Sequence, residues 1–194
     1  MGKLSSLFKE IPIHIRLFLG KALLFFIAWK IAYTFFIDPS LLDYPLTEHV
    51  SDASVFLLNN SGYLSDFTSE RIIIENGDTV YESSQIWHND YVVLYIADVC
   101  NGLELMVLYI GFIVCMPSSF WRKLKYIIIG VVIIDIINIL RCCGLIYLRE
   151  YFHQYFEFAH HYLFKIIVYG CTFIMWIIFS RKIKLKYEAK PIQV

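Results

Sequence analysis

Proline, glycine and charged residues are scarce in this chain of 194 residues, which has 5 Pro, 9 Gly and only 18% charged residues. So little proline and glycine excludes collagen-like and low-complexity sequences, and the many isoleucine, phenylalanine and tyrosine residues exclude a disordered chain. Neither positive nor negative charge predominates, because 17 Lys and Arg balance 17 Asp and Glu. The net charge therefore says nothing about nucleic acid, and we expect no nucleic-acid partner.

The chain is rich instead in long apolar stretches. Apolar residues make up 58% of it, and the mean hydropathy of +0.59 is too high for a soluble domain of this size. A helix of about 20 apolar residues crosses the hydrocarbon core of a bilayer, which is about 30 Å thick. We predict an all-α integral membrane protein in the lipid bilayer with about four transmembrane helices, at residues 17–37, 91–116, 126–148 and 162–179.

The distribution of basic residues predicts the orientation. Lys and Arg gather in the N-terminal arm, in the short connection at 117–125 and in the C-terminal tail, whereas the connection 38–90 has ten acidic residues and one basic residue, Arg71. Cytoplasmic segments carry the excess of Lys and Arg. We therefore expect a multi-pass protein of the cell (inner) membrane with both termini cytoplasmic and with residues 38–90 and 149–158 outside.

Two smaller elements are predicted beside the membrane helices. Residues 71–74 and 79–81 flank Glu75-Asn76-Gly77-Asp78, and Asn-Gly between β-branched runs is a strong signal for a β-hairpin. Residues 4–18 have apolar positions near helical spacing among basic ones, so we expect an amphipathic segment along the inner leaflet. The chain is thus a single membrane domain, 1–194, with an extracytoplasmic acidic loop at 38–90.

Polar residues inside the predicted membrane helices are the main functional signal. An ionisable side chain in lipid costs a few kcal/mol, so each one is a candidate for function. Asn138 and Arg141 are three residues apart, so they share one face of their helix with Asp135. The predicted topology brings Cys100, Arg141 and the pair His160-His161 to a similar depth near the outer face. The other polar residues in these helices are Asp98, Asn101, Glu104 and Lys165.

This combination suits a cysteine nucleophile. A thiol in apolar surroundings needs a nearby cation or base to become a thiolate. Arg141 stays charged and can stabilise a thiolate or an oxyanion, and a histidine can take the thiol proton and return it to a leaving amine. Gly102 leaves space for a substrate backbone beside Cys100, and Asn138 could orient Arg141.

Each of these residues also has a simpler interpretation. A cysteine in a membrane helix is more often a packing residue, which we expect of Cys115 and Cys171. An arginine near a helix end usually extends to the interface, and a histidine pair there is more often an anchor. Only the shared depth of the three groups favours a site. Two acidic residues have ion pairs as an alternative role, Asp135 and Glu104, with Lys30, Lys165 or Arg141 as partners.

Three motifs over residues 90–179 resemble those of the exosortase/archaeosortase family of membrane cysteine transpeptidases. Cys100-Asn101-Gly102-Leu103, preceded by Ile96-Ala97, is similar to its nucleophile motif. Asn138-Ile139-Leu140-Arg141 is similar to its Asn-x-x-Arg motif, and Ala159-His160-His161-Tyr162 to its His motif. The chain looks closest to the compact exosortases of Bacteroidetes. It lacks the extra N-terminal helices of larger members and has Lys165-Ile166 where many have Gly-Trp.

The resemblance implies a protein-sorting reaction. Substrates would be exported proteins that end in a C-terminal sorting signal, a transmembrane helix and a basic tail. Cys100 would form an acyl-thioester, which an acceptor then resolves, while Arg141 and His160 stabilise the oxyanion and move protons. His161 is the alternative to His160, which we favour because Tyr162 then has the expected offset. Residues 91–179 would be the catalytic helices. No cofactor or metal is implied, and no His/Cys spacing suggests zinc.

Two other functions compete with this one. A four-helix thiol oxidoreductase would use Cys142-Cys143, although such enzymes typically carry Cys-x-x-Cys pairs, which this chain lacks. A non-enzymatic membrane scaffold or assembly subunit would bind partners through the acidic loop, but it leaves Cys100, Arg141 and His160 without a purpose. We therefore favour the transpeptidase.

Overall fold

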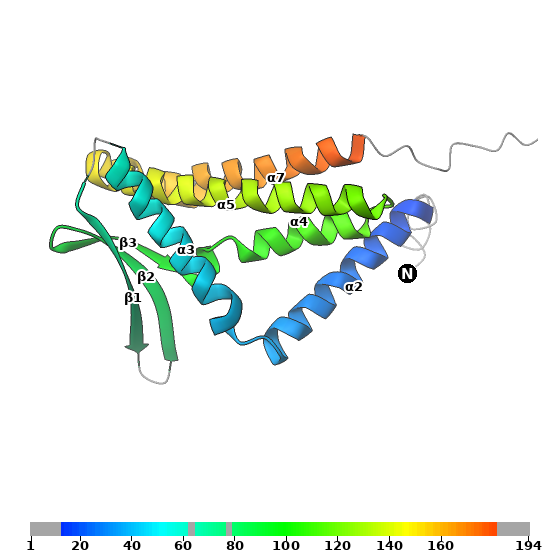
Figure 1. Cartoon of the computed structure of the whole chain (residues 1–194), viewed down its shortest axis with the longest axis horizontal. Coiled ribbons are helices and arrows are strands. Elements are labelled where there is room, and N and C mark those ends of the chain that lie inside the picture. The colour runs from blue at the N-terminus through cyan, green and yellow to red at the C-terminus, as the bar shows by residue number, and fades with distance from the viewer. Residues whose placement is uncertain (1–12, 62–64, 77–78, 182–194) are drawn as a thin grey trace, which may run out of the picture.

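The computed structural model describes residues 13–61, 65–76 and 79–181. Helices α4, α5 and α7 run along the long axis, α2 is inclined to them, and helix α3 and a small sheet gather at one end (Figure 1). In chain order the elements are α2 (Ile13–Phe35), α3 (Pro39–Asn60), β1 (Phe67–Asn76), β2 (Thr79–His88), β3 (Tyr91–Ala97), the 3-10 turn η1 (Asp98–Cys100), α4 (Leu103–Cys115), α5 (Phe120–Tyr151), α6 (His153–Phe158), the π turn η2 (Ala159–Leu163) and α7 (Phe164–Arg181).

Two helical runs in the described chain are long and apolar enough to cross a membrane. They are Phe120–Tyr151 and His153–Arg181, and they include the third and fourth predicted helices. Helix α4 is apolar too, but its 13 residues are fewer than the roughly 20 that span a hydrocarbon core. The first predicted helix, 17–37, corresponds to α2. Residues 13–18 of the predicted amphipathic segment belong to α2, and its earlier residues lie outside the described ones.

Large apolar side chains project outward from α2, α5 and α7. Leu24 on α2, Ile128 on α5 and Ile166 on α7 are all more than half exposed. Exposure of so much apolar surface is unfavourable in water, by roughly 25 cal/mol per Å², but not in hydrocarbon. The outer faces of these helices are therefore suited to lipid.

Small residues allow the helices to approach one another closely. A Cβ atom at Gly111 of α4 would lie 2.6 Å from the ring of Phe25, and one at Gly130 of α5 would lie 2.1 Å from the ring of Tyr109. The Tyr109 hydroxyl in turn donates to the main-chain oxygen of Tyr126, at 2.9 Å. Glycine at such contacts is typical of helix packing in membranes, where backbone approach replaces a hydrophobic driving force.

The predicted hairpin is confirmed and is part of a three-stranded antiparallel sheet in the order β1-β2-β3. Strands β1 and β2 pair from Phe67↔His88 to Asn76↔Thr79, so each is longer than predicted. The turn at 77–78 lies outside the described residues. A second hairpin joins β2 to β3, with Asn89 at a φ of 54° in its turn. Asparagine tolerates this left-handed conformation, which short hairpins need.

The second predicted helix, 91–116, is wrong in its first part. Residues Tyr91–Ala97 form strand β3, a 3-10 turn follows, and helix α4 begins only at Leu103. A short apolar run rich in β-branched and aromatic residues is compatible with a buried strand as well as a helix. Residues 91–97 form a strand here because they pair with β2.

The connection 38–90 also contains a helix, α3, that was not predicted. Its buried side combines apolar and polar residues at helical spacing, namely Asp43, Thr47, Val50, Ser54 and Leu58. Because the polar members interrupt the apolar pattern, hydrophobic periodicity does not reveal this helix. The all-α fold class is corrected accordingly: the protein is mostly helical, with one small sheet covered by α3.

The end of the molecule that carries α3 and the sheet has a core of its own. Val50 of α3, Phe67 and Ile86 of the sheet, and Ile146 of α5 are almost completely buried in one apolar cluster. This cluster joins α3 and the sheet to the longest helix. The end of β3, and with it Cys100, is thereby held against the middle of α5.

Candidate functional site

A cleft of about 160 Å³ between α4, α5 and α7 brings together four of the predicted site residues. Cys100, Gly102, Asn138 and Arg141 line it. Its remaining lining consists of Glu104, Leu105, Ile134, Phe164, Lys165, Val168 and Tyr169. A thiol and a guanidinium thus share one cleft whose other walls are mainly apolar.

Cys100 lies in a tight turn between strand β3 and helix α4. It is the last residue of η1 and is partly buried. The main-chain N–H of Leu103 donates to the side-chain oxygen of Asn101, at 2.9 Å, and Gly102 has a φ of 90°. Only glycine adopts this conformation at little cost. The Asn-Gly pair therefore reverses the chain directly after the thiol.

Asn138 lies between Cys100 and Arg141. Its side-chain nitrogen donates to the main-chain carbonyl of Cys100 at 3.3 Å, and its side-chain oxygen accepts from the guanidinium of Arg141 at 3.5 Å. The Asn138 side chain is almost fully buried, with 1% exposure. A buried amide with partners on both sides holds a fixed orientation. It therefore fixes the position of the Arg141 side chain relative to the Cys100 turn.

The two histidines lie at the edge of this arrangement. Neither His160 nor His161 is among the described residues that line the cleft. His160 is partly buried and lies within electrostatic range of Arg141 and Lys165. His161 is exposed, and its Nε2 is 3.2 Å from a carboxylate oxygen of Glu157. Of the two, His160 is therefore the one close to the cleft.

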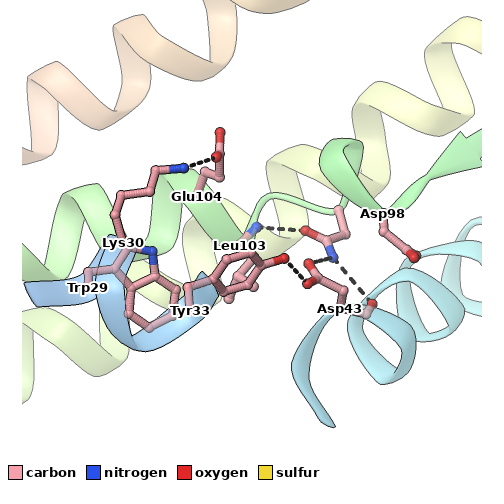
Figure 2. A pocket seen from close by; sticks show the side chains of 8 residues that line it. Trp29, Lys30, Tyr33, Asp43, Asp98, Leu103 and Glu104 are labelled. Carbon is pink, nitrogen blue, oxygen red and sulfur yellow. Dashed lines mark hydrogen bonds and ion pairs between the residues drawn. The ribbon is translucent and has the colours of Figure 1, made fainter. Parts of the chain in front are cut away.

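A buried polar network joins the Cys100 turn to helix α3. The side-chain nitrogen of Asn101 donates to Asp43 Oδ1 at 3.0 Å and to Thr47 Oγ1 at 3.3 Å. Thr47 donates to Asp98 at 2.7 Å. The Tyr33 hydroxyl donates to Asp43 (Figure 2). All of these residues except Thr47 border a second pocket, of about 120 Å³. Asp43 and Thr47 were missed from the sequence because they belong to the unpredicted helix α3.

Arg71, the one basic residue of the connection 38–90, joins this network from strand β1. Its guanidinium donates to Asp98 Oδ2 at 3.4 Å and stacks over the ring of Tyr44, 4.0 Å from the ring centre. Asp98 is therefore held from two sides, by Thr47 and by Arg71. The residues just before Cys100 are thus fixed to both α3 and the sheet.

The two acidic residues with alternative roles do form ion pairs. Glu104 is 3.1 Å from Lys30 of α2, as expected, and both side chains are exposed. Asp135 instead pairs with His49, at 3.1 Å, and not with any of the three partners considered from the sequence. His49 lies on α3, so the failure to predict that helix concealed the partner.

All five cysteines are free. Cys142 is buried in the apolar cluster that joins α3 and the sheet to α5, and the Sγ atom of Cys143 lies 3.7 Å from the main-chain oxygen of Ser54. Such surroundings are those of packing residues. Cys100 differs from these two because its residue lines an open cleft together with an arginine.

Comparison with known protein families matches residues 11–179 to the transmembrane exosortases. The resemblance found in three motifs over 90–179 is confirmed, and the match extends back through α3 and α2. No curated protein and no solved structure matched the chain. The match covers well over half of the chain and agrees with its two apolar helices of membrane-spanning length. The chain is therefore a membrane protein that belongs to the transmembrane exosortase family.

Proposed function

We propose that this chain is a cysteine transpeptidase that cleaves the C-terminal sorting signals of exported proteins and transfers them to an acceptor. The observation that supports this most directly is the cleft shared by Cys100 and Arg141, with Asn138 bonded to both residues. Membership of the exosortase family supports the same reaction class. The substrates proposed are proteins whose sorting signal is followed by a transmembrane helix.

The first half of the reaction forms an acyl-thioester. His160 accepts the thiol proton of Cys100, and the thiolate attacks the carbonyl carbon of the scissile peptide bond. Arg141 donates hydrogen bonds to the oxyanion that develops on the carbonyl oxygen. When the tetrahedral intermediate collapses, the C–N bond breaks and the leaving amine takes the proton from His160.

The second half releases the thioester. An amine or hydroxyl of the acceptor attacks the thioester carbonyl, loses its proton to His160, and expels the Cys100 thiolate. The protein then carries a new bond to the acceptor, and the thiolate recovers its proton from His160. A guanidinium is a poor base, so Arg141 serves as the charge-stabilising donor and His160 moves the protons.

The distribution of charge supports the proposed orientation. The guanidinium of Arg122 donates to the main-chain oxygen of Phe179, and Lys123 donates to that of Val114. The start of α5 thus meets the ends of α4 and α7, at the opposite end from the sheet (Figure 1). Because basic residues mark the cytoplasmic side, we place this end inside, with α2, α5 and α7 crossing. Helix α4 then enters the membrane from the inside, and the sheet, α3 and Cys100 lie toward the outside.

The surroundings of the vicinal cysteines favour the transpeptidase over the thiol oxidoreductase. Cys142 is 4% exposed and packs in an apolar cluster, so a redox partner would have no access to its sulfur. A scaffold would need neither the cleft nor the bonds that fix Arg141. We therefore retain one proposed function.

Replacement of Cys100 by alanine tests the proposal. In the source cells, Cys100→Ala should stay in the membrane but stop processing, so that exported proteins with intact C-terminal helices accumulate. Arg141→Lys should fail as well, since a point charge does not reproduce the planar donor fork. The matched control is Cys115→Ala, which removes a packing thiol of α4. Mass spectrometry of the C-termini of membrane proteins gives the readout.

A second measurement identifies the intermediate. Hydroxylamine cleaves thioesters, so it should release a hydroxamate of the substrate from wild-type protein and none from Cys100→Ala. Wild-type processing by Cys100→Ala would disprove the proposal. Loss of function only in the double variant Cys142→Ser, Cys143→Ser would support the oxidoreductase instead.

A further inference from the structure

Three side chains that can bind a metal ion lie together beside the cleft. They are Glu157 at the end of α6 and the neighbouring His160 and His161 of η2. One possible ligand atom from each lies within 4.8 Å of the other two. The closest pair is His161 Nε2 and the Glu157 carboxylate, at 3.2 Å.

The local backbone explains this convergence. Glu157 precedes His160 by three residues and His161 by four, and both spacings place side chains on the same face of a helix. The histidines belong to the π turn Ala159–Leu163, and their ring centres are only 5.0 Å apart. Helix-borne sites often use these two spacings, as in Glu-x-x-His and His-x-x-x-His motifs.

From this geometry we infer that Glu157, His160 and His161 bind one divalent first-row transition ion of the zinc class. Two imidazoles and one carboxylate are a common zinc ligand set, with a fourth position left for water. Metal–ligand distances of about 2.1 Å require ligand atoms roughly 3.4 Å apart. The three ligand atoms must therefore move slightly closer together when the ion binds. The exposed side chains of Glu157 and His161 have the freedom to do so. Calcium and magnesium prefer oxygen ligands and fit less well.

The surrounding charges decide which ions can bind. Arg141 and Lys165 lie within electrostatic range of His160 and repel a cation, whereas Glu157 attracts one. Together, the charges of these three residues therefore contribute little to the affinity for a cation. The affinity must come from coordination by the imidazole nitrogens. Such ligands favour zinc-class ions over hard cations.

Metal binding at this site would inhibit the chemistry, a consequence that rests on the proposed function. A metal-bound imidazole has one nitrogen on the ion and carries a proton on the other, so it has no free site to accept the thiol proton of Cys100. An ion on His160 thus removes the proposed proton carrier. The site is inhibitory and is not a cofactor site.

Direct binding tests the site independently of catalysis. The full chain without a polyhistidine tag, purified in detergent and stripped with chelator, should bind one Zn²⁺ by calorimetry and one Co²⁺ by visible absorption. Glu157→Gln and His161→Ala should each weaken binding more than about tenfold, because even outer-shell partners of ligands are worth about 10–100-fold. His153→Ala, an exposed histidine of α6 outside the group, is the control. Unchanged affinity in both site variants would overturn the inference.

Processing measured with and without Zn²⁺ tests the inhibition. Zinc should slow the wild-type chain, and Glu157→Gln should need more than about tenfold more zinc for the same effect. Specific binding with no slowing of the wild type would refute the inhibitory role. A metal-free wild type that does not process substrate would count against the proposed function, and the calorimetry would still decide the metal site.

Discussion

The side-chain amide of Asn138 donates a hydrogen bond to the main-chain carbonyl of Cys100, at 3.3 Å. The bond joins the middle of α5 to the turn that carries the candidate nucleophile. Because the oxygen of the same amide accepts from Arg141, one buried side chain relates the thiol and the guanidinium to each other. In the proposed reaction, the asparagine of the Asn-x-x-Arg motif would therefore be a positioning residue.

We expect Asn138→Leu to reduce processing about 100-fold, since a displacement of about 1 Å in a reacting group can have an effect of this size. Asn138→Asp should also be impaired, because a carboxylate cannot donate to the Cys100 carbonyl. The single-turnover rate of substrate cleavage is the measurement. Asn60→Asp, at an exposed asparagine of α3, should match the wild type. A wild-type rate in Asn138→Leu would contradict the positioning role.

Gly102→Ala should destabilise the protein by about 1–2 kcal/mol, the usual cost of a left-handed conformation for a residue with a Cβ. The strain comes from the φ of 90° and not from crowding, because the new Cβ would lie 3.5 Å from its nearest neighbour, Asn138. Thermal unfolding in detergent measures the change. Gly170→Ala inside α7 meets nothing within 4 Å and should not destabilise the protein, because alanine is favoured over glycine in a helix. Equal melting temperatures for the two variants would show that the turn is not strained.

Asp43→Ala should cost about 1–3 kcal/mol, because it leaves the buried amide of Asn101 without its carboxylate acceptor. Denaturant unfolding in micelles gives the free energy. The comparison variant is Glu48→Ala, which removes an exposed carboxylate from the same helix and should change stability by less than about 0.5 kcal/mol. If both substitutions cost the same, the network does not support the Cys100 turn.

A single cysteine placed at Asn89 should react with a membrane-impermeant maleimide from outside intact cells. Asn89 is exposed in the turn between β2 and β3, at the end that we place outside. A cysteine at Ser119, an exposed residue before α5, should react only after permeabilisation. Labelling is measured above that of the parent chain. The reverse pattern would invert the topology and move the cleft to the cytoplasmic side.

The sequence predicted the two longest apolar helical runs well, since these depend on local composition. Helices 126–148 and 162–179 each lie within about two residues of an observed helix or inside it. Strand β3 was missed because a short apolar run does not distinguish a strand from a helix. Helix α3 was missed because its buried face is half polar.

The partners of the candidate site could not be predicted for a related reason. Asp43 and Thr47 precede Asn101 by more than 50 residues and belong to the unpredicted helix. Nothing in a single sequence says that a polar residue on α3 will be buried against a turn after β3. The motifs identified Asn138 and Arg141, but not the carboxylate and hydroxyl that hold the Cys100 turn in place.

The shortness of α4 determines the depth at which the thioester would form. Thirteen residues rise about 20 Å, and the hydrocarbon core is about 30 Å thick. Lys123 binds the last turn of α4 and fixes that end at the proposed cytoplasmic boundary. With α4 upright in this orientation, Cys100 at the other end would lie roughly 10 Å below the outer boundary, in a recess within the membrane. Water is dilute there, so a bound acceptor amine competes well with hydrolysis, and a short helix thereby favours transfer of the protein over its simple release.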